Sequence, residues 1–306
     1  MTKVFIDGSA GTTGLRIHER LSERSDLELL ILSDELRKDA SARREMFAQA
    51  DIAFLCLPDA AAIEAVELAK DTNVKIIDTS TAHRTNPDWV YGFAELTGYE
   101  KIASATRVAN PGCHASGFVA LIAPLVRAGL IAPDVALSCV SLTGYSGGGK
   151  KMIAEYEDFE LDPLYAAPRQ YGLSQSHKHL PEMKAVTGLT TAPAFCPIVA
   201  NFYSGMEVTI PVFAKDLKGT ADDIRALYAD TYQKGLVRYN AEMDEEGFLS
   251  AGAFEGRDDM EVGVFGNDER VLLVSRFDNL GKGASGAAIQ NMNIMLGVEE
   301  STGLCV

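Results

Sequence analysis

The stretch that decides the fold is KVFIDGSAGTTGLRIHERL, residues 3–21. Residues 3–7 form a short apolar run typical of a buried strand, and residues 15–21 have helical spacing. A glycine turn between them lets backbone N–H groups and the helix N-terminus meet a pyrophosphate without side chains in the way. We therefore predict a dinucleotide site at Gly8, Gly11, Thr12, Thr13 and Gly14.

The spacing of these glycines leaves one alternative open. It is GxxGxxG rather than the commoner GxGxxG, and a glycine-rich turn occurs in many α/β proteins. The place of the loop, between a first strand and a first helix, favours the dinucleotide site. The Lys-Ser/Thr pair of a phosphate-binding P-loop is missing from this segment.

Strands and helices alternate along the first third of the chain. Further strands are predicted at residues 27–32, 52–57 and 75–78, with a helix at 60–70. This rhythm is typical of a parallel sheet covered on both faces. We predict an α/β protein whose residues 1–112 form an N-terminal Rossmann domain with a doubly wound parallel sheet.

The pattern changes after about residue 135. Strand-like runs at residues 135–142, 207–213 and 271–276 are separated by long connections rather than by regular helices. We predict that residues 113–283 form a C-terminal α+β domain with a mixed or antiparallel sheet. The last segment is helical again at 284–296, and we expect residues 284–306 to complete the first domain.

Composition excludes several classes of function. The 306 residues carry a net charge of −15, which disfavours nucleic acid and anionic membranes as partners. The least charged stretch, residues 108–126, contains prolines and does not have the character of a membrane span. The first residues show no secretory signal pattern, and five scattered cysteines without a CxxC pair argue against disulfides and structural zinc. We expect a cytoplasmic protein.

The segment after the second predicted strand bears on the choice of dinucleotide. Ser33 and Arg37 offer a hydroxyl and a guanidinium that suit the 2′-phosphate of NADP, with more basic residues downstream (Lys38, Arg43 and Arg44). Asp34 instead suits the ribose hydroxyls of NAD, and an exposed charged helix explains the same residues without a ligand. We favour NADP, bound through Ser33 and Arg37.

Cys113 is the candidate nucleophile. Asn110-Pro111-Gly112 makes a sharp turn before it, and an apolar helical run follows. At a helix N-terminus the dipole stabilises a thiolate and lowers the pKa of the thiol. A buried cysteine that serves as a small hydrophobe is the alternative, and Cys56 and Cys139 fit that description because they lie inside strand-like runs.

Two histidines are candidates for proton transfer to and from the reacting group. His177 and His179 precede a helix start, whereas His18 falls in the first helix and is expected on the surface. His114 adjoins Cys113, but adjacent helical side chains diverge by about 100°. No partner lies at the spacing of a zinc motif, so we predict no metal.

Basic residues offer a place for a phosphate. Arg84 follows a strand at the edge of the sheet where a doubly wound fold binds its ligands. The run SGGGKK at residues 146–151 offers Ser146 and Lys150, although a flexible loop with solvated lysines is as plausible. Together these pieces indicate thiol-dependent reduction of an activated acyl group.

Five segments together resemble one known family. They are GSAGTTG at 8–14, DTSTAHR at 78–84, YGFAEL at 91–96, NPGC at 110–113 and DNLGKGASG at 278–286. In this order they resemble N-acetyl-γ-glutamyl-phosphate reductase in its shorter form, a relative of aspartate-semialdehyde dehydrogenase. The resemblance implies an NADP-dependent, cytoplasmic enzyme of arginine biosynthesis that forms a homodimer or homotetramer.

The same resemblance implies roles for particular residues. Cys113 matches the nucleophile, and His179 resembles the general acid/base, with His177 as a possible substitute. Arg84 matches the arginine that holds the substrate phosphate, while Glu95, Ser146 and Lys150 lie in segments expected at the substrate. The residues expected along the cofactor, besides the glycine loop, are Ser80, Asn279, Gly283 and Ala284.

The function that follows is NADPH-dependent reduction of N-acetyl-L-glutamyl 5-phosphate to N-acetyl-L-glutamate 5-semialdehyde through a cysteine thioester. Aspartate-semialdehyde dehydrogenase is the nearest alternative, because its chemistry is identical. A non-catalytic redox sensor that binds NADP, with Cys113 as a regulatory thiol, is an alternative of another class.

Overall fold

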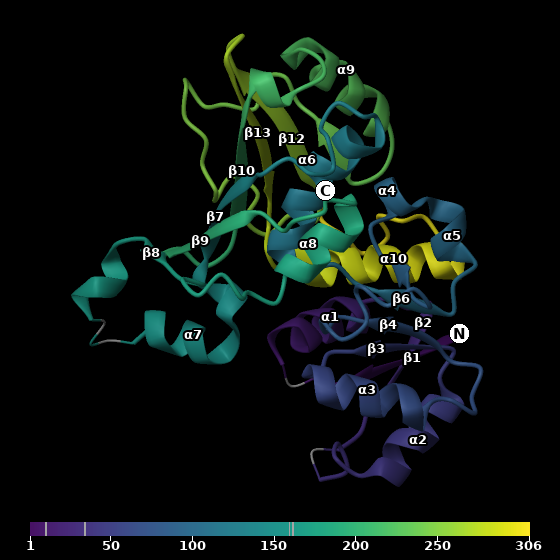
Figure 1. Ribbon diagram of the computed structural model, residues 1–306. Coiled ribbons are helices and arrows are strands. Elements are labelled where there is room, and N and C mark those ends of the chain that lie inside the picture. Colours follow the sequence, from purple (N-terminus) through teal and green to yellow (C-terminus); the bar gives the residue numbers. More distant parts are fainter. Residues whose placement is uncertain (10, 34, 159, 161) are drawn as a thin grey trace. The chain divides into compact units, whose positions relative to one another are not determined.

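The protein is described by a computed structural model that covers residues 1–9, 11–33, 35–158, 160 and 162–306 (Figure 1). The prediction for Asp34 lies outside the described residues. The chain forms two compact units, one of residues 1–111 with 284–304 and one of residues 112–283 with 305–306.

The first unit contains a six-stranded sheet whose neighbouring strands all run parallel. Its order is β2-β1-β3-β4-β6-β5. The strand order therefore changes sides at β1, with β2 on one side of it and β3 on the other, as in a doubly wound fold. The strands are β1 Thr2–Asp7, β2 Leu27–Leu30, β3 Ile52–Leu55, β4 Lys75–Asp78, β5 Val90–Tyr91 and β6 Arg107–Ala109. The predicted parallel Rossmann sheet is confirmed.

Helices cover both faces of this sheet because successive strand residues point to opposite sides. Val4 and Ile6 belong to one cluster of buried side chains, and Phe5 between them belongs to another. The helices of this unit are α1 Thr12–Ser22, α2 Ala40–Gln49, α3 Asp59–Leu68, α4 Ala94–Thr97, α5 Tyr99–Ala103 and α10 Gly286–Leu296. Burial of one such apolar side chain stabilises the folded state by about 1.5–3 kcal/mol, so the two clusters hold the helices against both faces of the sheet.

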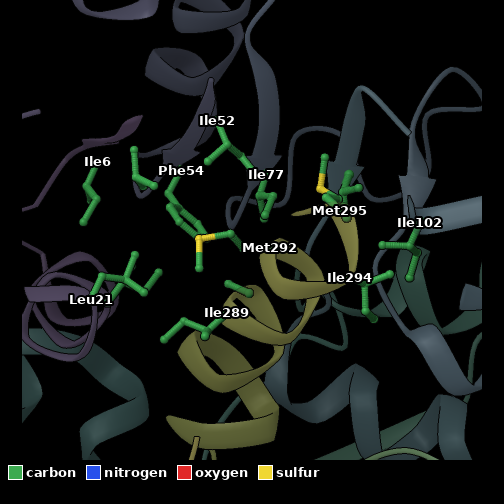
Figure 2. Packing of buried hydrophobic residues seen from close by; sticks show 14 of the residues in the cluster. Ile6, Leu21, Ile52, Phe54, Ile77, Ile102, Ile289, Met292, Ile294 and Met295 are labelled. Atoms are coloured by element: carbon green, nitrogen blue, oxygen red, sulfur yellow. The ribbon is translucent and has the colours of Figure 1, made fainter. Parts of the chain in front are cut away.

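Helix α10 comes from the far end of the chain. Ile289, Met292 and Met295 pack in the same cluster as Ile6, Phe54 and other side chains of one sheet face (Figure 2). Residues 286–295 of α10 are all buried, and the helix is accordingly apolar on every side apart from the buried amides of Gln290, Asn291 and Asn293. Residues 284–304 cluster with the first unit, and residues 305–306 with the second.

The second unit contains a seven-stranded mixed sheet of order β11-β12-β13-β10-β7-β9-β8. Two pairs, β7 with β9 and β11 with β12, are parallel, and the rest are antiparallel. A wholly antiparallel sheet is therefore wrong, and a mixed one is confirmed. The strands are β7 Ser138–Gly144, β8 Arg169–Gln170, β9 Ala194–Ala200, β10 Met206–Phe213, β11 Val237–Tyr239, β12 Met260–Gly266 and β13 Arg270–Phe277.

Four α-helices accompany this sheet in the described residues: α6 Cys113–Arg127, α7 Gly149–Tyr156, α8 Leu180–Thr187 and α9 Ala221–Thr231. Helix α6 packs against β10, β13 and α8 and is almost wholly buried. Its first residue, Cys113, is only partly buried. No described helix is both long enough and apolar enough to cross a bilayer.

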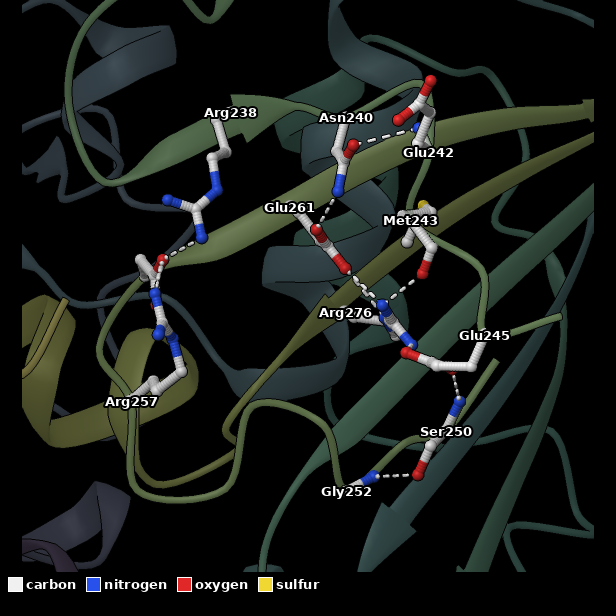
Figure 3. Close-up of polar contacts among 11 residues, drawn as sticks. Arg238, Asn240, Glu242, Met243, Glu245, Ser250, Gly252, Arg257, Glu261 and Arg276 are labelled. Atoms are coloured by element: carbon white, nitrogen blue, oxygen red, sulfur yellow. Dashed lines mark hydrogen bonds and ion pairs between the residues drawn. The ribbon is translucent and has the colours of Figure 1, made fainter. Parts of the chain in front are cut away.

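A cluster of charged side chains that bind one another lies at one end of the second sheet. Arg276 of β13 binds Glu261 of β12 and Glu245, each at 2.6 Å, and also reaches the carbonyl of Met243 (Figure 3). Arg276 and Glu261 are both buried, so each compensates the other's lost hydration. On the same face of the sheet, away from these charges, Val140, Phe213 and Leu272 are exposed.

Candidate active site

The glycine loop joins β1 to α1 and borders a cavity of about 300 Å³ in the first unit. The cavity is open to the carboxyl ends of β1, β2 and β3, where doubly wound folds bind their ligands. Its lining is mostly apolar and includes Leu29, Leu32 and Pro58. The basic residues His18, Arg37 and Lys38 also line it.

Each glycine of the loop meets a different steric demand. Gly8 has a φ of +92°, and a Cβ there would lie 2.3 Å from the carbonyl oxygen of Cys56. At Gly14 a Cβ would lie 2.4 Å from the carbonyl oxygen of Gly8, so helix and loop pack backbone to backbone. Gly11 has no such neighbour closer than 3.6 Å. Two glycines thus shape the turn, and the third leaves its backbone open to a ligand.

The first turn of α1 offers backbone donors beside that cavity. Gly11 is the N-cap and no side chain caps the helix, whose first residues are Thr12 and Thr13. This turn also lacks acidic side chains, so none of its own residues opposes an anion at the positive end of the helix dipole. The loop therefore fits the pyrophosphate of a dinucleotide.

The basic residues after β2 separate into two groups. Arg37 and Lys38 line the cavity, whereas Arg43 is buried and binds Asp7 at 2.9 Å. Arg43 is thus removed from the set of predicted phosphate ligands. Ser33 does not line the cavity, but its carbonyl accepts from the N–H of Arg37 at 3.1 Å and so fixes the turn that carries Arg37.

His18 is placed otherwise than predicted. Instead of an isolated surface position, its side chain is half-buried and forms part of the cavity wall. It lines this cavity together with Gly8 and Gly11 of the glycine loop.

Ser80 and Arg84 belong to a loop held by a buried carboxylate. Asp78, at the end of β4, accepts hydrogen bonds from the hydroxyl and the N–H of Ser80, and His83 Nδ1 lies 2.6 Å from it. The His83 ring stacks on Trp89 at 4.1 Å. Arg84 is buried too, and it donates from Nε to the Asn110 carbonyl and from Nη2 to the Thr79 carbonyl, each at 2.9 Å.

Glu95 and Ala284 lie in the first unit as well. Glu95 of α4 accepts a hydrogen bond from Gln290 of α10 at 3.0 Å. The carbonyl of Ala284 accepts from the Asn110 side chain, also at 3.0 Å. Both residues thus take part in the contacts that fasten α10 to this unit.

Cys113 is the first residue of α6 in the second unit, directly after the N-cap Gly112. The buried Glu182 of α8 accepts a hydrogen bond from the Gly112 N–H at 2.9 Å and so anchors this helix start. Gly283 lies against the cysteine: a Cβ there would sit 3.0 Å from the Cβ of Cys113. In contrast, burial raises the pKa of Cys56 to about 12 and also raises that of Cys139, so both of those thiols stay protonated.

The predicted histidines lie around His114, the neighbour of Cys113. The rings of His177 and His179 are each 5.6 Å from the ring of His114 and 4.8 Å from each other. Burial and the nearby Lys178 lower the pKa of His177. His179 is almost fully buried just before α8, whereas His177 is half-buried.

Ser146 and Asn279 are neighbours in the second unit. The amide of Asn279 donates to the Ser146 hydroxyl at 3.0 Å and accepts from the Gly205 N–H at 2.9 Å. The alternative of a flexible loop does not hold for residues 145–148, which form a 3₁₀ turn that leads into α7. Lys150 is exposed on the first turn of α7.

In one neighbourhood of the second unit His177 and His179 lie around His114, whose sequence neighbour Cys113 lies against Gly283. In another, Ser146 contacts Asn279. Sequence reasoning missed Ser141, Tyr171 and Glu182, which contact the first neighbourhood through His114 and Gly112. Only Glu182 carried a signal, since it follows His179 in the His-Leu-Pro-Glu run. Among the described side chains, no group of three His, Cys, Asp or Glu is placed to hold a metal ion.

Comparison with known proteins agrees with the fold of both units. Residues 3–105 match the semialdehyde dehydrogenase NAD binding domain, and residues 113–279 match the semialdehyde dehydrogenase dimerisation domain. In structure the chain is similar to aspartate semialdehyde dehydrogenase II of Vibrio cholerae (TM-score 0.73, 17% identity, 97% of this chain and 98% of that one). It is also similar to the Francisella tularensis aspartate semialdehyde dehydrogenase (TM-score 0.71, 15% identity, 97% and 100%). At these identities the likeness concerns the fold.

Two curated relatives are much more similar in sequence. The N-acetyl-gamma-glutamyl-phosphate reductase 2 of Nostoc sp. is 44% identical over 99% of both chains. The N-acetyl-gamma-glutamyl-phosphate reductase of Brucella anthropi is 46% identical over 96% of this chain and 98% of that one. The chain therefore belongs to the N-acetyl-γ-glutamyl-phosphate reductase family, within the semialdehyde dehydrogenases.

Proposed function

We propose that the chain reduces N-acetyl-L-glutamyl 5-phosphate to N-acetyl-L-glutamate 5-semialdehyde with NADPH, in arginine biosynthesis. Sequence identity of 44–46% over nearly the full length to reductases of that name supports the choice of this substrate. The observation that carries the chemistry is Cys113 at the start of α6, followed directly by His114, around which the rings of His177 and His179 lie. A thiolate is favoured there by the helix dipole and is the form that attacks an acyl phosphate.

Cys113 opens the reaction. Its sulfur attacks the γ-carbonyl carbon of the acyl phosphate, the C–O bond to phosphate breaks, and a thioester forms on the enzyme. NADPH supplies a hydride for the thioester carbon. His179 gives a proton to the oxygen of the resulting thiohemiacetal and takes it back as the C–S bond breaks, which releases the aldehyde and the thiolate. Backbone N–H groups at the start of α6 stabilise the oxyanion, a contribution of about 3 kcal/mol per donor.

NADP is the proposed cofactor. Arg37 and Lys38 line the cavity beside the glycine loop and offer two positive charges for a 2′-phosphate. Arg84 is proposed to act at the substrate phosphate, and Ser80, Asn279, Gly283 and Ala284 along the cofactor, as the family resemblance implies. The buried contacts of Arg84 with two carbonyls would hold its guanidinium in a fixed orientation.

A homodimer or a homotetramer is the proposed assembly, built through the mixed sheet of the second unit. That unit matches a dimerisation domain, and Val140, Phe213 and Leu272 expose apolar surface on one face of its sheet. The cytoplasm is the proposed compartment, supported by five cysteines among which no disulfide forms in the described residues.

An assay with two substrates tests this proposal. We expect NADP reduction when N-acetylglutamate semialdehyde and phosphate are added, and little with aspartate semialdehyde and phosphate. The reverse preference would make the chain an aspartate-semialdehyde dehydrogenase. Binding of NADPH without turnover of either substrate would support the redox sensor.

The variant Cys113→Ser tests the covalent step in the same assay. It should abolish turnover, because a serine hydroxyl beside a helix N-terminus remains protonated, yet it should bind NADPH as the wild type does. A variant that keeps most of its rate would contradict the thioester route.

His179→Asn tests the acid/base assignment. It should lower kcat by the 10²–10⁴-fold typical of lost acid–base catalysis. His177→Asn is the matched comparison, since the two rings are neighbours with different burial. A larger loss in His177→Asn would assign the proton transfer to His177.

A further inference from the structure

Glu182 is a buried acid to which the proposed mechanism gives no role. It lies in the first turn of α8, exposes only 2% of its surface, and accepts a hydrogen bond at Oε1 from the Gly112 N–H at 2.9 Å. The other buried residues of α8, Leu180, Met183 and Thr187, are apolar or carry a single hydroxyl. A buried carboxyl group costs free energy unless its oxygens are hydrogen-bonded, so packing alone does not explain a glutamate at this position.

The backbone that Glu182 holds lies one residue before the nucleophile. Gly112 is the N-cap of α6, and it has no side chain with which to cap that helix. In a capping box, a Glu or Gln at the third helical position accepts a hydrogen bond from the N-cap N–H. The third residue of α6 is Ala115, which has no acceptor in its side chain. Because Gly112 is buried, its N–H needs an acceptor from another element.

Helix α8 supplies this acceptor. Glu182 is the third residue of α8, whose N-cap is His179, so by position it is the capping-box residue of its own helix. The His179 N–H, however, donates to Nδ1 of His177 at 3.2 Å. Helices α6 and α8 pack against each other, and Glu182 reaches across to the N-cap of α6. Residues 177–182 thus carry an acceptor for the start of each helix.

We propose that Glu182 is a positioning residue for the nucleophile. As an acceptor held by α8, it fixes the Gly112 backbone and thereby the direction in which the Cys113 side chain leaves the start of α6. The reach of its oxygen matters rather than its charge, since a negative charge beside a helix N-terminus opposes a second one on the sulfur. The inference deepens the proposed function, because it rests on Cys113 as the residue that attacks the acyl phosphate.

Two substitutions separate reach from charge. Glu182→Gln keeps the length of the side chain and an acceptor oxygen but removes the charge. Glu182→Asp keeps the charge but is one methylene group shorter, so its oxygens no longer come within hydrogen-bond distance of the Gly112 N–H. If reach matters, the glutamine variant should resemble the wild type and the aspartate variant should not. If charge matters, the order should be reversed.

The first readout is the rate of phosphate release in the first turnover, measured by rapid mixing of the full-length chain and NADPH with N-acetylglutamyl phosphate. Glu182→Asp should slow this step about 10–100-fold, because a misplacement of about 1 Å can cost 100-fold in rate. Glu182→Gln should stay within about threefold of the wild type. The control Glu245→Asp should react as the wild type does. Glu245 also accepts a backbone N–H, that of Ser250 at 3.1 Å, but it lies between β11 and β12.

The second readout separates a misdirected sulfur from an unreactive one. Iodoacetamide diffuses freely and needs no fixed angle of attack, so near pH 10, about 1.5 units above the usual pKa of a thiol, all variants should be alkylated at Cys113 at the same rate. Slow phosphate release together with normal alkylation means that the thiolate is present but points away from the bound substrate. A fall in both rates would overturn the proposal.

The third readout needs no substrate. Hydrogen exchange of the Gly112 amide, followed by mass spectrometry with fragmentation to single residues, reports directly on the hydrogen bond to Glu182. Exchange in Glu182→Gln should be as slow as in the wild type. In Glu182→Asp it should be about tenfold faster, because the amide has lost its acceptor.

Two results would overturn the positioning role. Wild-type phosphate release in Glu182→Asp would mean that the hydrogen bond is not needed, and an equal loss in Glu182→Gln would mean that the charge is. Thermal unfolding of each variant shows whether it is folded. Should Glu182→Asp fail to fold, Glu182→Met takes its place with the same expectations, since methionine keeps the length of the side chain and removes the acceptor.

Failure of the proposed function gives a different pattern. If the wild type releases no phosphate from the acyl phosphate, the proposed function fails. Exchange at Gly112 that is faster only in Glu182→Asp then still supports the anchor at Cys113, and equal exchange in all variants overturns it. If the enzyme is active and Glu182→Asp releases phosphate as fast as the wild type, the positioning role fails and the proposed function stands.

Discussion

A buried histidine makes the stability of this protein depend on pH. The pKa of His114 is about 3 in the folded chain and about 6.5 in an unfolded one. Between these values the unfolded state binds the proton and the folded state does not, so the free energy of unfolding rises with pH. The contribution is complete above about pH 6.5 and is lost as the pH falls toward 3.

We therefore expect His114 alone to cost the folded protein about 2 kcal/mol at pH 5 relative to pH 8. Urea unfolding of the wild type and of His114→Gln at the two pH values measures this, because glutamine does not titrate. The difference between pH 8 and pH 5 should be smaller in the variant by that amount. Equal differences would mean that His114 is protonated in the folded chain.

Single residues also mark a limit of what the sequence could tell. Four basic side chains follow β2 with the same charge, and only the folded chain shows that Arg43 is neutralised by the buried Asp7 while Arg37 faces a cavity. The partner of Arg43 lies 36 residues away, and nothing local marks the pair. The partners of His114 are likewise set by long-range contacts, 27 and 57 residues distant.

Among the elements, the β1–loop–α1 unit has two tight positions and one open one. Gly14→Ala would place a Cβ 2.4 Å from the Gly8 carbonyl and force loop and helix apart. We expect a loss of about 1–3 kcal/mol in the free energy of unfolding and weaker NADPH binding. Thermal unfolding and NADPH fluorescence titration measure the two effects.

Gly11→Ala is the matched comparison. Its Cβ would have 3.6 Å of clearance, so stability should be kept while NADPH binding weakens, because the methyl group occupies the space where a pyrophosphate approaches. Unchanged affinity in this variant would remove the loop from the cofactor site.

Most elements of the first unit could be predicted well because each has a local sequence pattern. Strands β1 to β4 coincide with apolar runs that are bounded by turn residues, and the glycine loop follows directly after β1. In the second unit β8, β9, β11 and β12 escaped prediction. Strand β12 carries Glu261 and Gly263 inside an apolar run, and the charge is tolerated only because Arg276 of β13 meets it (Figure 3). Strand β9 contains Pro197, and β8 and β11 have only two and three residues.

For the whole molecule, the exposed sheet face of the second unit is the place where we propose that two chains associate. Phe213 and Leu272 expose 55% and 40% of their surface on that face. We expect the double variant Phe213→Asp and Leu272→Asp to dissociate the proposed dimer, because two charges in a buried apolar contact are costly. Sedimentation velocity measures the change.

Ile63→Asp is the control for this pair. Ile63 exposes a similar fraction, 56%, but belongs to α3 of the first unit. The control should sediment as the wild type does. Dissociation by Ile63→Asp, or none by the double variant, would place the interface elsewhere.

Helix α10 gives the first unit a particular dependence on the order of synthesis. Residues 1–111 emerge early from the ribosome, yet one face of their sheet is covered by Ile289, Met292 and Met295, which are translated almost 180 residues later. Until then that face of the sheet is covered only in part, by side chains such as Ile17 and Leu21 of α1 and Ile102 of α5. The cofactor-binding half of this enzyme can therefore mature only after the other half has been translated.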